Sequence, residues 1–90
     1  MWSYKIVITV KEIKGTCTAQ KVGDKIEVIG DKVEGNICTM AFHTIFPYIF
    51  AMQYGADFPW LKNKDETLAY CPDPAGLALF EIKRVKLQNP

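Results

Sequence analysis

The sequence has little excess charge, few cysteines and a single histidine. Eleven basic and ten acidic side chains nearly cancel, leaving a formal net charge of +1 at pH 7. Proteins that bind nucleic acid through its phosphate backbone usually carry a basic excess, so this balance argues against that class of partner. Three cysteines are an odd number, which excludes a fully paired set of intrachain disulfides. The G-x-G-x-x-G, Walker, G-x-S-x-G and H-E-x-x-H motifs are also absent, so no common enzyme signature identifies a reaction.

Neither end of the chain carries a recognisable targeting signal. No basic segment precedes an apolar one in Met1–Lys5, and Lys86–Pro90 matches no lipidation or retention signal. We therefore expect a cytoplasmic protein whose thiols are reduced or bound to metal.

One uncharged run is long enough to test the possibility of a membrane span. Residues 35–56 contain no Asp, Glu, Lys or Arg, but they include Asn36, His43, Pro47 and Gln53. The flanking charges, Glu34 and Asp57, are acidic rather than basic. A buried or interface helix is therefore favoured over a membrane-spanning one.

Length and composition indicate one globular domain, residues 1–90. The chain is 49% hydrophobic and 23% charged, as ordinary domains are. Segments that alternate apolar and polar residues predict half-buried strands, and Gly-Asp pairs separate several of them as turns. The predicted strands are Trp2–Ile13, Lys25–Ile29, Leu68–Cys71 and Leu77–Val85, and Lys32–Val33 is expected to pair back briefly as a hairpin.

The uncharged run predicts a helix from Ile37 to about Tyr54. Asn36 is the expected N-cap and Gly55 the expected C-terminal cap. Pro47 lies in the middle, so we expect either a kinked helix or two short ones. The element order β-β-α-β-β predicts an α+β fold in which a mainly antiparallel sheet packs on one principal helix. The helix is apolar around nearly its whole circumference and a sheet covers only one side, which predicts a homo-oligomer, most simply a dimer, through this helix.

A set of short segments is distributed along the chain: Gly15-Thr16-Cys17, Val22-Gly23-Asp24, Ile37-Cys38, Pro47-Tyr48-Ile49, Gly55, Phe58-Pro59-Trp60, Cys71-Pro72-Asp73-Pro74 and Phe80-Glu81-Ile82-Lys83-Arg84. In the order and spacing of these segments, the chain resembles a family of small single-domain proteins of unknown function, found mainly in anaerobic bacteria and archaea. The resemblance spans nearly the whole chain and implies a cytoplasmic protein from an anaerobe, with no established activity. It includes the three cysteines and Asp73, and it does not include His43.

The cysteines are the first candidates for chemistry. Cys17 falls in a loop, Cys38 at the start of the helix, and Cys71 before a proline turn. Three thiols from three elements could converge on a soft metal ion, Zn or Fe, with a fourth ligand from Asp73, water or another subunit. Cys38 or Cys71 could instead act as a nucleophile. No C-x-x-C spacing supports a metal site, and the simplest alternative is that each cysteine is a small buried apolar residue.

Four further residues are candidates for function, and each also has a purely structural interpretation. Asp73 is either a turn residue or a carboxylate fixed beside Cys71. Trp60 is either part of a lid over a pocket formed by the helix and the Cys71 turn or a cover for the open end of the core. Arg84 points inward if the alternation of its strand continues, where it needs a carboxylate or an anionic ligand, but we favour its release to solvent at the strand end. His43 is interpreted as a packed or interface residue.

Three functions remain open at this point. The first is a binding protein for a metal or small ligand, with a cysteine-lined pocket that includes Cys17, Cys38, Cys71, Asp73, Trp60 and Arg84. The second is an interaction subunit that acts through the apolar helix, and the third is a thiol-dependent enzyme.

Overall fold

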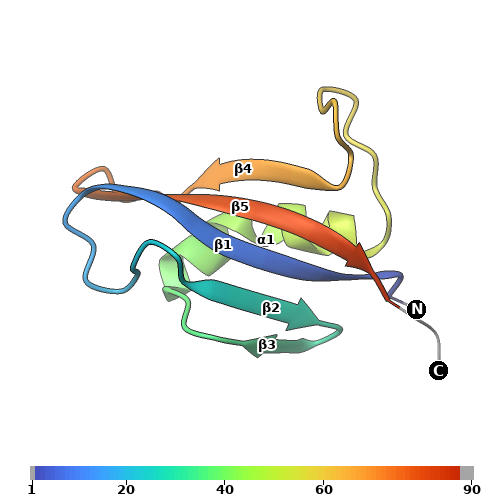
Figure 1. Cartoon of the computed structure of the whole chain (residues 1–90), viewed down its shortest axis with the longest axis horizontal. Helices are drawn as coiled ribbons and strands as arrows, with labels where there is room; N and C mark the ends of the chain where they lie inside the picture. The colour runs from blue at the N-terminus through green and yellow to red at the C-terminus, as the bar shows by residue number, and fades with distance from the viewer. Residues whose placement is uncertain (1, 88–90) are drawn as a thin grey trace.

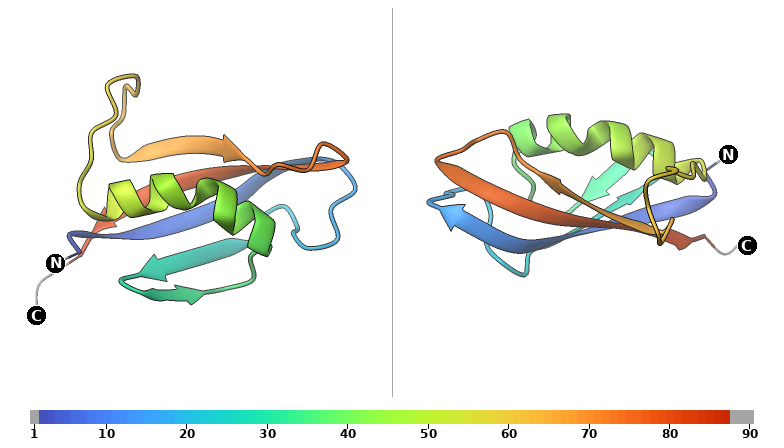
Figure 2. Two further views of the ribbon diagram at one scale, coloured as in Figure 1. Left: turned by 180° about the vertical axis from the view of Figure 1, so that it is seen from behind. Right: turned by 90° about the horizontal axis from the view of Figure 1, so that it is seen from above.

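The computed structural model describes residues 2–87, which form an antiparallel sheet with one helix packed on one of its faces (Figures 1 and 2). This arrangement confirms the predicted α+β fold. The short hairpin at Lys32 is a true fifth strand, so the described residues follow the order β-β-β-α-β-β. The strand order across the sheet is β3-β2-β1-β5-β4. The elements are β1 (Tyr4–Gly15), β2 (Lys25–Ile29), β3 (Lys32–Glu34), α1 (Thr39–Gln53), β4 (Glu66–Tyr70) and β5 (Gly76–Lys86).

The inner face of the sheet carries the core. As the alternation predicts, Ile6 and Ile8 of β1 are fully buried, and so are Phe80 and Ile82 of β5. Because successive side chains of a strand point to opposite faces, this pattern places one apolar row of each central strand against α1. The helix contributes Ala41, Ile45, Ile49 and Met52 to the same core.

A bulge in β1 changes the phase of its alternation. The register against β5 shifts between Val10 and Glu12, so that Val10 and Lys11 together oppose Phe80. Ile13 then returns to the inner face, opposite Ala78, and packs against the core. Without the bulge, the end of the strand would turn Ile13 toward solvent.

The outer face of the sheet is open and carries cross-strand ion pairs. Lys5 pairs with Glu27 at 3.3 Å, and Lys83 lies 3.7 Å from both Glu66 and Glu81. Exposed pairs of this kind each contribute at most about 1 kcal/mol. Together they place several of the acidic and basic side chains of the chain next to each other on this face.

The helix is continuous through Pro47, so the proline does not divide it in two. It begins at Thr39 with Cys38 as the N-cap residue, and Asn36 instead donates its side-chain amide to the Ala19 carbonyl. The expected C-terminal cap is confirmed, because Gly55 has a φ of 85° and its N–H donates to the Met52 carbonyl. The N–H of Ala56 also donates to the Ala51 carbonyl, which completes a Schellman motif.

Candidate functional site

Cys71 is a buried structural residue of the β4–β5 turn. Its Sγ accepts a hydrogen bond from the Ala78 N–H at 3.2 Å and donates to the Gly76 carbonyl at 3.5 Å. The side chain belongs to the core cluster. The thiol is thus engaged on both its donor and its acceptor side within its own turn.

The other two cysteines belong to the β1–β2 loop and to the start of α1, two segments that lie at the same end of the sheet as the β4–β5 turn (Figure 2). Cys17 follows β1, and its Cα lies beside Gly76. Cys38 is half-buried at the start of α1, where its backbone N–H donates to Gln20 Oε1 at 2.7 Å. Within residues 2–87 no group of three or more His, Cys, Asp or Glu side chains is placed to hold a metal ion. These residues therefore provide no three-ligand group that would support the expected three-cysteine site for Zn or Fe.

Replacing Cys71 with serine should lower the free energy of unfolding by about 1–2 kcal/mol, because the turn loses a buried polarisable side chain and its fitted hydrogen bonds. Urea denaturation measures this loss. Cys17→Ser is the matched control, since that thiol lies in a half-exposed loop and its replacement should change stability little. Equal stability of Cys71→Ser and the unsubstituted protein would contradict a structural role.

Asp73 serves the turn rather than the thiol. Its Oδ1 accepts a hydrogen bond from the Ala75 N–H at 3.0 Å, the pattern of an Asx turn. Of the two interpretations of this residue, the geometry supports the turn.

Arg84 points inward, so the expectation of its release to solvent is wrong. The alternation of β5 continues to its end, and the Arg84 side chain is only 4% exposed. Its Nε donates to Asp65 Oδ1 at 2.9 Å, its Nη1 to the Ala56 carbonyl at 2.6 Å and its Nη2 to Asp57 Oδ1 at 3.1 Å. The guanidinium also stacks on the Tyr4 ring, 4.7 Å from its centroid. These protein groups supply the carboxylates that an inward arginine needs, so Arg84 clamps the α1–β4 loop to the sheet.

The charge of this clamp is insensitive to pH. Burial desolvates the guanidinium and by itself lowers its pKa, but hydrogen bonds to Asp65 and Asp57 raise it, and the net pKa of Arg84 is raised. The positive charge of Arg84 therefore stabilises the fold fully at any pH below the ordinary arginine pKa. This contribution is lost only as the pH rises through the still higher pKa that Arg84 has in the folded protein. Arg84 stays charged throughout the physiological range.

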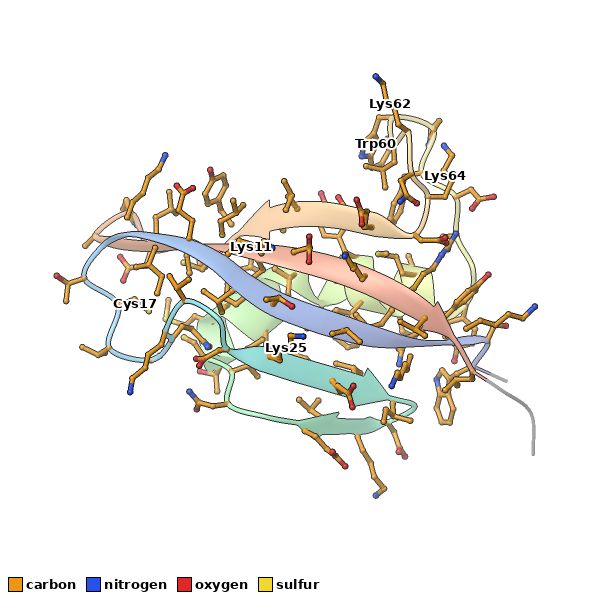
Figure 3. The ribbon with its side chains drawn as sticks, in the orientation of Figure 1. Lys11, Cys17, Lys25, Trp60, Lys62 and Lys64 are labelled. Carbon is orange, nitrogen blue, oxygen red and sulfur yellow. The ribbon has the colours of Figure 1, made fainter. Side chains whose placement is uncertain are left out.

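The loop held by Arg84 presents Trp60. Phe58 packs against the core and meets Tyr48 of α1 edge to face, with ring centroids 5.7 Å apart. Trp60 stacks on Phe58 at 5.0 Å and 15°, yet it remains 66% exposed. Figure 3 shows Trp60 with Lys62 and Lys64 on this loop, far from Cys17. Of the two interpretations of this cluster, the geometry favours the cover: Phe58 packs on the core, and Trp60 lies toward the opposite end of β4 from Cys71.

A cavity of about 540 Å³ lies between this loop and β4. Trp60 and Leu61 line it from the loop, Glu66 and Leu68 from β4, and Glu81 from β5. No cysteine lines this cavity. The cavity beside Trp60 therefore does not include the thiols.

The outward face of α1 exposes large apolar side chains that the core does not use. Met40 is 61% exposed, Phe46 42%, Phe50 53% and Tyr54 51%. Four large apolar side chains thus face solvent along one helix. The sequence predicted an uncovered side of the helix, and the structure identifies the residues that form it.

Aromatic side chains recur at every fourth position on the flank of this face. Phe42, Phe46, Phe50 and Tyr54 form a ladder with successive ring centroids 5.6, 6.0 and 5.2 Å apart. Side chains four residues apart lie next to each other on a helix, so this spacing builds a continuous ridge. Beside the ridge, a groove of about 380 Å³ is also lined by Trp2 and by Val28 and Val33 of the sheet. The fourfold spacing is visible in the sequence and is the signal that could have located the ladder.

Comparisons with protein-family models, with curated proteins and with solved structures find no match to this chain. The family resemblance therefore stays a prediction, and the function has to be argued from the geometry. Among the described residues, no helix has the length and hydropathy needed to cross a membrane.

Proposed function

We propose that the protein is an interaction subunit that forms a homodimer through the outward face of α1. The observation that carries this proposal is the exposure of Met40, Phe46, Phe50 and Tyr54 on a single helix face. Exposed apolar patches of this kind on a small protein are characteristic of interaction sites.

The charge pattern favours a second copy of the chain as the occupant. Residues 35–56 contain no Asp, Glu, Lys or Arg, so two copies of α1 brought together by a twofold axis place no like charges in contact. The ladder supplies a ridge along the i±4 rows of the helix. Ridges of this class interdigitate when two helices pack across each other.

The size of the face predicts the strength of the dimer. At about 200 Å² for each large side chain, the exposed fractions of Met40, Phe46, Phe50 and Tyr54 sum to roughly 400 Å². A standard interface buries about 800 Å² on each partner. The adjoining groove near Trp2 and Val33 adds to the helix face, and the result is a concentration-dependent dimer rather than a permanent one.

Replacing Phe50 with lysine should abolish the dimer, because it brings two like charges onto an apolar interface near the twofold axis. Sedimentation equilibrium over a concentration series measures the change. Lysine is a good helix former and Phe50 is exposed, so the stability of the monomer should change by less than about 0.5 kcal/mol.

The matched control is Val22→Lys, which places the same charge at a 62% exposed apolar residue of the β1–β2 loop. This variant should dimerise as the unsubstituted protein does. A protein that stays monomeric at millimolar concentration, or a Phe50→Lys variant that dimerises normally, would refute the proposal.

The cysteines have no direct part in this function. Cys71 and Cys38 pack with the core at one end of the sheet, and their hydrogen bonds hold the local turns. Their role in this account is to fix the end of the scaffold on which α1 begins.

A further inference from the structure

Strand β4 forms one edge of the sheet, and its outer backbone groups are available for pairing. The N–H of Cys71 donates to the Ala78 carbonyl and the N–H of Arg84 to the Asp65 carbonyl, which identifies these as hydrogen-bonded pairs. Such pairs alternate along an antiparallel ladder. By this alternation Ala69 bonds to β5, whereas Leu68 and Tyr70 direct their N–H and C=O groups to the free edge. In residues 2–87 no strand pairs with that edge.

The two edges of the sheet differ in how they are protected. The opposite edge, β3, has three residues and carries the charged side chains of Lys32 and Glu34. Short length and charge are the usual means of preventing edge pairing. Strand β4 is longer and exposes Leu68 at 57% and Tyr70 at 45%. This edge therefore lacks the protection that the other one has.

The Trp60 loop adds a binding surface beside this edge. The loop rises past the edge of the sheet next to β4 (Figure 1). Its base is fixed by the three hydrogen bonds from the buried Arg84, and Trp60 rests on Phe58. An exposed indole that is held in place in this way is preorganised, so a ligand that stacks on it loses little free energy to ordering the loop.

We propose that β4 binds an extended peptide segment of another protein as an additional strand. The backbone of the segment pairs with Leu68 and Tyr70, and one of its apolar or aromatic side chains enters the cavity beside Trp60. Main-chain hydrogen bonds supply affinity and the cavity supplies specificity, as in other cases of β-strand addition. A guest residue opposite Glu66 or Leu68 has its side chain on the outer face, where both residues line the cavity.

The shape of the edge favours a single segment over a second copy of the whole sheet. One added strand occupies about 4.8 Å beyond β4. If a second copy paired through its own β4, the β5 strand of that copy would lie one strand further out. Strand β5 has 11 residues and β4 has 5, so this β5 would extend beyond the two paired β4 strands. The extra length of that strand would meet the Trp60 loop, which stands past the edge (Figure 1). The site is also separate from the outward face of α1, so it does not depend on the proposed dimer.

The test is selection of a phage-displayed library of random 12-residue peptides on the full chain, with two variants as counter-targets. Leu68→Pro removes the N–H that faces the free edge, a position at which an edge strand tolerates proline. Trp60→Ala removes the stacking surface and should weaken selected peptides about tenfold. Val22→Ala, which shortens an exposed apolar side chain elsewhere, should leave their affinity unchanged.

Hydrogen exchange of the complex supplies a readout that fold stability does not. The amides of Leu68 and Tyr70 should exchange at least about tenfold more slowly with a selected peptide bound, whereas Ala69, which already pairs with β5, should change little. Thermal denaturation of both variants verifies that they fold.

The proposal is overturned if no peptide is enriched, or if enriched peptides bind folded Leu68→Pro and Trp60→Ala as well as they bind the unsubstituted protein. It is also overturned if Leu68 and Tyr70 become protected on raising the protein concentration without peptide, since that result would assign the edge to a second copy. Phe50→Lys should lose dimerisation and still bind the selected peptides with unchanged affinity, because the outward face of α1 and the β4 edge are independent sites.

Discussion

Replacing Arg84 with methionine should lower the free energy of unfolding by about 3 kcal/mol, and the melting temperature by roughly 10–20 °C. Methionine keeps an apolar stem but removes the guanidinium, which donates to the Ala56 carbonyl, Asp57 and Asp65. Charge-assisted hydrogen bonds from a buried donor are stronger than average. The expected loss is smaller than the sum of three such bonds, because the side chains of Asp57 and Asp65 are 68% and 65% exposed. Water can solvate both carboxylates when Arg84 is absent.

Arg84→Lys is the matched control for charge. Lysine retains the positive charge but lacks the planar fork that reaches three acceptors, so it should recover less than half of the lost stability. The indole of Trp60 should also become more mobile in Arg84→Met, because the base of its loop is released. A lower tryptophan fluorescence anisotropy would report this motion. Full stability of Arg84→Met would show that the clamp is incidental.

Replacing Gly76 with alanine should cost about 2–4 kcal/mol, because the backbone that follows β1 approaches the start of β5 too closely there for a side chain. An added Cβ would clash with the Thr16 carbonyl oxygen and lie 3.1 Å from the Cys17 Cα. Both neighbours are backbone atoms, so the β1–β2 loop and β5 must move apart. The neighbouring β4–β5 turn, including the Cys71 hydrogen bond to the Gly76 carbonyl, should loosen as well.

Gly23→Ala is the control that separates the cost of a steric clash from the cost of an unfavourable backbone conformation. Gly23 has a φ of 96° but nothing within 4 Å of an added Cβ, so alanine there should cost only about 1 kcal/mol of conformational strain. Chemical denaturation of both variants compares the two costs. Equal losses would show that the close approach at Gly76 relaxes without penalty.

Local patterns predicted the elements and their faces well. The alternation of β1 and β5 identified Ile6, Ile8, Phe80 and Ile82 as inward, and all four are buried. Gly55 was recognisable as a helix cap because few other residues adopt its φ. These features depend on residues close together in the sequence, where the periods of strand and helix are decisive.

The candidate site was harder to predict because it depends on contacts between distant segments. The inward direction of Arg84 follows from its strand, but the partners that make this position favourable come from the α1–β4 loop, 19 and 27 residues away. The positions of the thiols depend in the same way on how three loops pack at one end of the sheet. Spacing alone could not show whether Cys17, Cys38 and Cys71 would form a group able to hold a metal ion, and within residues 2–87 they do not.

The sequence predicted that one side of the uncharged helix is left uncovered, but it did not predict which side. An apolar circumference indicates that something must cover it, yet the side left open depends on how α1 rotates over the sheet. The structure shows that Ile45 and Ile49 face inward, while Phe46 and Phe50 remain exposed.

The most direct test of the account is an isotope-filtered NMR experiment on an equimolar mixture of ¹³C-labelled and unlabelled protein. If two copies pack through α1, intermolecular NOEs will connect the side chains of Met40, Phe46, Phe50 and Tyr54 across the dimer. They will disappear on dilution below the dissociation constant. Intermolecular NOEs confined to Leu68 and Tyr70 on the β4 edge, or none at any concentration, would contradict the central claim that the outward face of α1 binds a second copy.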